Sequence, residues 1–148
     1  MNQPSAGAFA LQHRTKPVVL CVDDDPQILA AIQRTLQSQA YDLITVPHAA
    51  GALEWLEALS VNLVIADEHM PKMTGTDLLL EVHRRYPETA KVILTGFPGH
   101  RVMSRSKAAG VDALLFKPWD EKGLRETVLR ILAGQSKAPP SSPPDDLS

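Results

Sequence analysis

Short hydrophobic runs alternate along this chain with longer segments in which hydrophobic residues recur at helical spacing. The short runs predict β-strands at residues 17–22, 42–46, 62–66, 91–94 and 113–116. Runs such as Leu63 to Ala66 are continuously hydrophobic, which is typical of strands that are covered on both faces of a parallel sheet.

The segments that follow these strands predict amphipathic helices. The first helix begins at Pro26 behind Asp25, a favoured residue type for the N-cap, and its hydrophobic residues include Ile28, Ile32 and Leu36. The other helices are predicted at about residues 49–59, 75–85, 99–109 and 120–133. Strand–helix alternation with short loops and right-handed crossovers predicts an α/β fold, a doubly wound five-stranded parallel sheet with helices on both faces.

The predicted helix at 99–109 differs from the others because its hydrophobic face is weak. It carries Arg101, Arg105 and Lys107 without an acid of its own to balance them, and it ends at Gly110, a favoured residue for terminating helices. A weak hydrophobic face predicts weak attachment, so this segment is expected to be mobile. A solvated surface helix without a special role explains the same pattern.

Length and composition restrict the classes of protein to which the chain can belong. Its 148 residues accommodate one domain, predicted at 16–134, between a flexible lead at 1–15 and a Pro/Ser-rich linker or disordered tail at 135–148. The net charge of -2 gives no broad basic surface for nucleic acid. No hydrophobic run reaches the roughly 20 residues of a membrane span, and the lead does not resemble a signal peptide, so a cytoplasmic protein is expected.

Polar residues follow four of the predicted strands at the point where each strand ends. They are Asp23, Asp24 and Asp25 after the first strand, Asp67 after the third, Thr95 after the fourth and Lys117 after the fifth. Each alone is as well explained by a helix cap or a turn. In the strand order 2-1-3-4-5, however, these four strands are neighbours, and a parallel sheet brings their carboxyl ends to one edge.

This combination of residue types suits phosphoryl transfer. Carboxylates of Asp23, Asp24 and Asp67 placed close together would repel one another and need a cation, for which Mg²⁺ is well suited. Ionised Asp67 can then act as a nucleophile toward phosphorus, while Lys117 stabilises negative charge on the transferring oxygens. The Thr95 hydroxyl can donate a hydrogen bond to the attached phosphoryl group.

The same segments resemble the receiver domain of two-component response regulators, a CheY-like domain with a flavodoxin-like fold, over about residues 16 to 134. The matching segments are residues 22–25, 63–75, 94–96 and 116–118. The resemblance implies that Asp67 is the phosphoryl acceptor, that Thr95 is the switch hydroxyl and that Lys117 binds the phosphoryl group. It also implies a cis peptide bond before Pro118, a phosphoprotein that changes only its own phosphorylation state, and a role in phosphorelay signal transduction.

The resemblance further implies a Mg²⁺ site. Asp24 would bind the ion directly, Asp23 mainly through water, and Asp67 together with the backbone carbonyl of His69 would complete the protein ligands. The implied phosphodonor is a sensor histidine kinase or a phosphotransfer protein, and the implied target is an output domain or a downstream protein. Whether the chain forms a homodimer is left open.

One position departs from the family pattern. Receivers usually carry an aromatic residue three positions before the lysine, where this chain has Leu114. The aromatic side chain of the family moves inward upon phosphorylation, so we expect the signal here to travel instead through the Thr95 loop and the weakly attached helix at 99–109.

Two alternatives to this interpretation differ in class. An aspartyl-nucleophile phosphohydrolase of the haloacid-dehalogenase type would use Asp23 and Asp25 after the first strand, but it leaves the Met70–Pro71 loop unexplained and needs a substrate pocket. The chain is otherwise either a free-standing adaptor or the N-terminal receiver of a multidomain regulator. The amino-acid sequence at residues 95–97 and 116–120 is similar to the same segments of receivers that precede HD-type cyclic-di-nucleotide phosphodiesterases.

Overall fold

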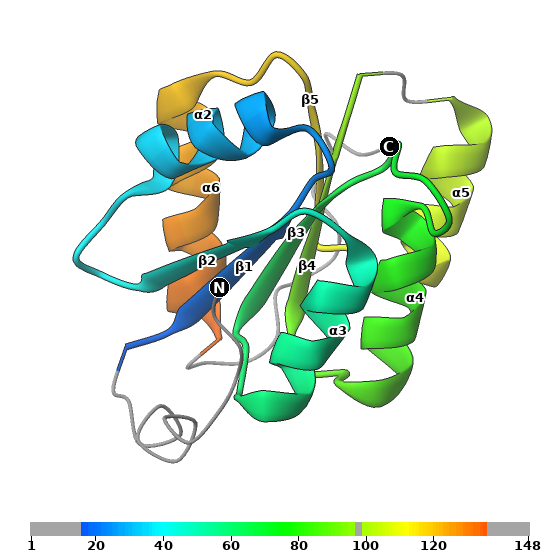
Figure 1. Ribbon diagram of the computed structural model, residues 1–148, viewed down its shortest axis with the longest axis horizontal. Coiled ribbons are helices and arrows are strands. Elements are labelled where there is room, and N and C mark those ends of the chain that lie inside the picture. The colour runs from blue at the N-terminus through cyan, green and yellow to red at the C-terminus, as the bar shows by residue number, and fades with distance from the viewer. Residues whose placement is uncertain (1–15, 97–98, 136–148) are drawn as a thin grey trace.

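A parallel sheet of five strands lies at the centre of the part of the chain that the computed structural model describes, residues 16–96 and 99–135 (Figure 1). The strands are β1 (Val18–Val22), β2 (Asp42–Val46), β3 (Leu63–Asp67), β4 (Ala90–Thr95) and β5 (Ala113–Phe116). Their order is β2-β1-β3-β4-β5 and all neighbours are parallel. The predicted fold class and strand order are confirmed, and each strand boundary lies within one residue of its prediction.

Helices cover both faces of this sheet, as predicted. Figure 1 shows α2 (Pro26–Leu36) and α6 (Glu121–Gly134) on one face, and α3 (Ala49–Ala58), α4 (Gly75–Arg85) and α5 (His100–Ala108) on the other. Two separate hydrophobic clusters fill the spaces between the sheet and these two layers of helices.

The continuous hydrophobic run of β1 contributes side chains to both hydrophobic clusters. All five residues from Val18 to Val22 are buried, with Val19 and Cys21 facing α2 and α6, and Leu20 and Val22 facing α3 and α4. Because successive side chains of a strand point to opposite faces, a strand covered on both sides must be hydrophobic at every position. Cys21 is fully buried, and this burial raises the pKa of its thiol far above the usual range, so we interpret it as an inert core residue.

The predicted helix boundaries have visible physical causes. The Asp25 side chain accepts a hydrogen bond from the Gln27 amide at 2.8 Å and caps α2. At the end of α5, Gly110 adopts a φ of +70°. Its amide donates to the Lys107 carbonyl, and the Val111 amide donates to the Ser106 backbone carbonyl. This pair of bonds is the Schellman arrangement that glycine favours, and it ends α5 where the sequence predicts.

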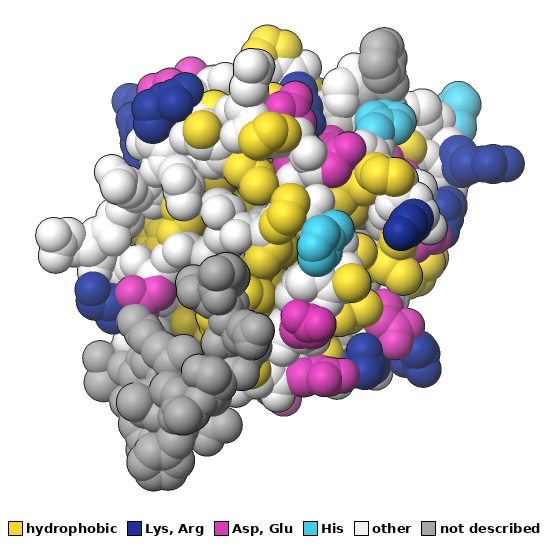
Figure 2. All heavy atoms as spheres, in the orientation of Figure 1, with side chains coloured by type: hydrophobic (Ala, Val, Ile, Leu, Met, Phe, Trp, Pro, Cys, Tyr) yellow, Lys and Arg dark blue, Asp and Glu magenta, His cyan; other side chains and the backbone are white. Residues whose placement is uncertain are grey.

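Helix α5 is held to the domain by little hydrophobic surface. Between His100 and Ala108, Ser106 is its one buried residue, and Met103 is 39% exposed. Arg105, which has no acid within its own helix to balance it, forms an ion pair with Asp77 of α4, because helices distant in sequence meet on this face of the sheet. Figure 2 shows basic and histidine side chains gathered over α5, at the right of the view. The expected mobility of α5 remains a prediction.

Within the ranges 16–96 and 99–135, no helix has both the length and the hydrophobicity needed to span a bilayer.

Candidate functional site

The four strand ends singled out in the sequence lie side by side at the carboxyl edge of the sheet. In the sheet register, Val22 of β1 pairs with Ala66 of β3, so Asp23 and Asp67 follow at adjacent positions. Along β4, Leu94 pairs with Asp67 and Thr95 pairs with Phe116, which places Lys117 beside the end of β4. The topology therefore brings together residues that are up to 94 positions apart in the sequence.

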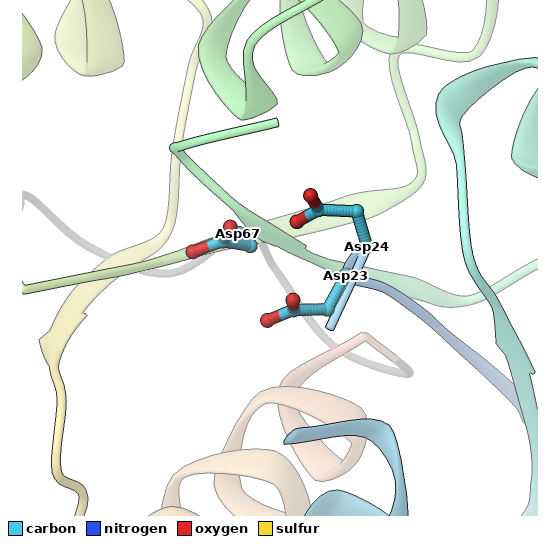
Figure 3. Close-up of side chains that lie close together, drawn as sticks. All are labelled: Asp23, Asp24 and Asp67. Atoms are coloured by element: carbon cyan, nitrogen blue, oxygen red, sulfur yellow. The ribbon is translucent and has the colours of Figure 1, made fainter. Parts of the chain in front are cut away.

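Three carboxylates converge at this edge (Figure 3). Asp23 and Asp24 extend from the end of β1 toward Asp67 at the end of β3, and each offers an oxygen within 4.8 Å of the others. Asp23 and Asp67 are buried, at 1% and 4% exposure, whereas Asp24 is exposed to solvent. The cluster is thus anchored in the protein on one side and open to solvent on the other.

Lys117 supplies the positive charge that faces these acids. Its Nζ atom donates to Asp67 Oδ1 at 2.8 Å and to Asp23 Oδ2 at 3.0 Å. Its backbone amide donates to the Thr95 carbonyl at 2.9 Å, which fixes the start of the β5–α6 loop against β4. The peptide bond between Lys117 and Pro118 is cis, as the resemblance implies.

Burial and pairing act in opposite directions on the charged groups. Burial raises the pKa of the Asp23 carboxyl, and the charge of Asp67 adds to this, although hydrogen bonds from the Asp25 amide and from Lys117 counteract it. Burial alone would lower the pKa of the Lys117 ammonium, but its hydrogen bonds to Asp67 and Asp23 outweigh burial and raise the pKa. Lys117 therefore remains protonated at neutral pH and holds two carboxylates that repel each other.

These residues fit a magnesium ion. Mg²⁺ prefers oxygen ligands and commonly uses one or two carboxylates together with water and phosphate oxygens. Among the described residues, three carboxylates face the one ammonium of Lys117, so the cluster retains excess negative charge that a divalent cation would neutralise. The exposed side of Asp24 leaves access for water and for a phosphoryl group.

The raised pKa of Asp23 predicts how the free energy of unfolding depends on pH. The folded protein holds this proton to higher pH than the unfolded chain does, so the free energy of unfolding falls as pH rises from about 3.8 through the folded pKa. We expect Asp23→Asn, measured by chemical denaturation at pH 7 without divalent ions, to stabilise the protein by about 1 kcal/mol and to reduce this pH dependence.

The matched control is Asp24→Asn, because Asp24 is exposed and its substitution should change the denaturation midpoint little. A lower midpoint for Asp23→Asn than for wild type at pH 7 would contradict the prediction. It would mean that the ion pair with Lys117 outweighs the cost of burying the charge.

The remaining predicted site residues lie near this cluster. Thr95 ends β4 and is fully buried, whereas His69 is exposed in the loop that follows β3. Leu114 in β5 is 9% exposed and packs in the hydrophobic cluster beneath α3, α4 and α5. No aromatic side chain occupies that position.

Glu68 belongs to the site although the sequence pattern did not indicate it. Its side chain is buried at 5% exposure beside Asp67, and it accepts a hydrogen bond from the Thr76 amide at 2.8 Å. The sequence contained a weak signal, because an acid directly after a strand and a Gly-Thr pair at the start of the next helix can meet across a short loop. Two carboxylates from adjacent positions, Asp67 and Glu68, are therefore buried with separate partners.

Comparisons with known proteins agree with this geometry. The family described as "Response regulator receiver domain" matches residues 19–129. The chain is similar to the hydrogenase transcriptional regulatory protein HoxA of Cupriavidus necator, at 30% identity over 79% of this chain and 24% of that protein. It is also similar to the response regulator protein FleR of Pseudomonas aeruginosa, at 31% identity over 79% of this chain and 25% of that protein. The chain thus spans about a quarter of the length of these curated relatives.

Solved structures give the same result. The signal receiver domain of an HD domain-containing protein from Pseudomonas fluorescens Pf-5 superimposes with a TM-score of 0.78 at 33% identity, covering 82% of this chain and 98% of that one. A CheY-like response regulator receiver domain protein from Methanospirillum hungatei JF-1 superimposes with a TM-score of 0.78 at 30% identity, with the same coverage.

Proposed function

The chain belongs to the response regulator receiver domain family, and from this premise we propose that it accepts a phosphoryl group on Asp67 and changes a partner surface in response. The observation that carries the proposal is the position of the Lys117 ammonium, which bridges Asp67 and Asp23 at the carboxyl edge of the sheet. Phosphorylation of an aspartate is the general feature of the family.

The proposed reaction uses Asp67 as an ionised nucleophile. One of its carboxylate oxygens forms a bond to phosphorus, the phosphorus–nitrogen bond of a phosphohistidine breaks, and the imidazole departs with that electron pair. Lys117 lies within hydrogen-bond distance of Asp67 and can transfer its hydrogen bond to an incoming phosphoryl oxygen. Later attack of water on phosphorus would release phosphate and restore the Asp67 carboxylate, so the domain acts only on its own phosphoryl group.

The metal would be held by Asp23, Asp24 and Asp67, and we assign the His69 backbone carbonyl as a further ligand. When bound there, Mg²⁺ supplies positive charge that offsets the charge of the transferring oxygens. The excess of carboxylate over ammonium at this cluster supports the assignment.

The test is the intact mass of the wild-type protein after incubation with a small phosphodonor, with and without Mg²⁺. We expect a gain of one phosphoryl group that requires Mg²⁺ and is lost on treatment with hydroxylamine, which cleaves acyl phosphates. No gain with the small donor or with a sensor kinase would overturn the proposal.

We propose that phosphorylation is transmitted through Thr95 and α5 rather than through an aromatic residue in β5. Leu114 is already packed in the core, and α5 buries little surface of its own, so α5 is the element that needs least energy to shift. Phosphorylated protein should therefore show faster or slower amide exchange in residues 99–111 than unphosphorylated protein, while β1 and β2 exchange alike in both. Identical exchange in the two states would contradict this route.

The partners follow from the same proposal. A sensor histidine kinase or phosphotransfer protein would supply the phosphoryl group, and the α5 side would face an output domain or a separate target protein. The domain would extend over residues 16–134. The similarity to the receiver of an HD domain-containing protein supports an output of that kind, and the transcriptional regulators among the relatives support a gene-regulatory output.

A further inference from the structure

Glu68 closes the loop that joins the phosphoryl-acceptor strand to the next helix. Its Oε1 atom accepts hydrogen bonds from the Thr76 amide at 2.8 Å and from the Thr76 hydroxyl at 2.5 Å. Its backbone carbonyl accepts from the Gly75 amide at 3.1 Å, and its backbone amide donates to the Leu94 carbonyl at 3.0 Å. One residue therefore joins the end of β3 to β4 on one side and to the first turn of α4 on the other.

The first turn of α4 packs directly on the acceptor residue. A Cβ atom added at Gly75 would lie 2.3 Å from the Asp67 carbonyl oxygen, so a side chain there would displace the backbone of Asp67. Thr76 is fully buried and Glu68 is nearly so. Because both partners are shielded from water, the hydrogen bonds between them fix the distance between Asp67 and α4 more firmly than bonds at the surface would.

The position of the Glu68 charge explains how a fourth carboxylate is accommodated beside three others. Its partners are a helix N-terminal amide and a hydroxyl, and the N-terminus of a helix favours negative charge. The Glu68 carboxylate is thus stabilised by hydrogen bonds from the first turn of α4, while Asp23, Asp24 and Asp67 form the cluster that lacks sufficient positive charge. These two groups of carboxylates have separate partners and, we infer, separate roles.

We propose that Glu68 is a positioning residue for the metal and phosphoryl site. By holding both ends of the loop at residues 69–74, its carboxylate keeps the Asp67 side chain and the His69 carbonyl where a divalent cation can use both. The proposal rests on the assignment of Asp67 and His69 made above. It adds that the affinity for the cation depends on a residue that does not touch it.

The test compares Mg²⁺ affinity, measured by calorimetry on unphosphorylated protein, across a set of matched variants. Glu68→Leu removes both side-chain hydrogen bonds, and Thr76→Val removes only the one from the hydroxyl. Glu68→Gln keeps an amide oxygen that can accept both bonds but removes the charge. Thr89→Val is the control, because Thr89 is also buried and donates its hydroxyl to the Val61 carbonyl at 2.9 Å, at the opposite edge of the sheet.

We expect Glu68→Leu and Thr76→Val to weaken Mg²⁺ binding by about 10-fold, within the range for groups that orient metal ligands. Glu68→Gln should bind nearly as wild type does, and Thr89→Val should lower stability without changing Mg²⁺ affinity. The double variant Glu68→Leu/Thr76→Val should bind no more weakly than Glu68→Leu alone, because the two residues act through one contact. Amide exchange in residues 69–76 should accelerate in Glu68→Leu in the absence of any metal.

Several outcomes would overturn the proposal. One is unchanged Mg²⁺ affinity in Thr76→Val and Glu68→Leu, and another is an equal loss in Thr89→Val. A loss in Glu68→Gln as large as in Glu68→Leu would show that charge, not position, matters. If Glu68→Leu does not fold, the Mg²⁺ affinities of Thr76→Val and Glu68→Gln still distinguish a role in positioning from a role of charge. These measurements need no phosphoryl transfer. A wild-type protein that binds Mg²⁺ but gains no phosphoryl group would therefore refute the proposed function alone. A wild-type protein that binds no Mg²⁺ would refute this inference.

Discussion

Asp67→Asn is expected to abolish the Mg²⁺-dependent gain of a phosphoryl group completely. The amide of asparagine is a poor nucleophile and cannot form the acyl phosphate that the ionised carboxylate can. The substitution preserves size and retains an oxygen that can accept the hydrogen bond that Lys117 now donates to Asp67 at 2.8 Å. The measurement is intact mass after incubation with a small phosphodonor, and the fold should be checked by thermal unfolding of the same sample.

Asp23→Asn is the matched control, because it also removes a buried carboxylate that accepts a hydrogen bond from Lys117. We expect it to slow phosphorylation through weaker metal binding but to leave a phosphoryl gain at high Mg²⁺ concentration. The aspartyl phosphohydrolase alternative makes the opposite prediction, with Asp23 as the modified residue. A phosphoryl group that persists in Asp67→Asn and disappears in Asp23→Asn would therefore refute the receiver assignment.

Lys117→Met is expected to slow phosphoryl transfer to Asp67 by about 10²- to 10³-fold, the usual loss when one preorganised donor to a developing negative charge is removed. Methionine keeps much of the length of lysine but carries no charge and no N–H donor. The rate should be measured from the time course of the intact mass at saturating Mg²⁺, so that a change in metal affinity does not disguise the effect.

Lys117→Met should also lower stability at neutral pH in the absence of metal. Asp23 and Asp67 are buried and would lose their common cation, and unpaired buried charges destabilise folded proteins. Since Lys117 itself is 22% exposed, solvent reduces the cost to about 2 kcal/mol, below the usual range for a fully buried pair. Mg²⁺ or acidic pH should restore most of it.

Lys122→Met provides the control for both measurements. Lys122 is an exposed lysine in the first turn of α6, a few residues after Lys117. It should transfer phosphoryl groups at the wild-type rate and retain wild-type stability. A Lys117→Met protein that matches Lys122→Met in rate would show that the ammonium takes no part in the chemistry.

Much of the candidate site could be predicted because its signals are local. Each strand is a short hydrophobic run followed by a polar residue, and both features are visible without knowledge of any distant segment. The parallel sheet then requires these strand ends to share one edge. For this reason the sequence alone associates Asp23, Asp24, Asp67, Thr95 and Lys117, and the strand order and register agree.

The sequence was less informative where a side chain chooses among several distant partners. The sequence showed no acid within its own helix to balance Arg105, and the partner that the structure supplies is Asp77, because the packing of α5 against α4 decides which residues of the two helices meet. Glu68 gave no clear signal, since a charged residue after a strand is usually in solvent. Its burial depends on the close approach of Gly75 to Asp67, which is a property of the folded loop.

The order of the elements, the class of fold and the residues that end each strand follow from local features of the sequence, because hydrophobic periodicity and capping act over a few residues. The contacts of Lys117 with Asp23 and Asp67, of Glu68 with Thr76, and of Arg105 with Asp77 arise only when distant segments pack together. These contacts depend on how helices pack and how loops close. Small shifts in packing exchange one partner for another while leaving the hydrophobic pattern of the chain unchanged.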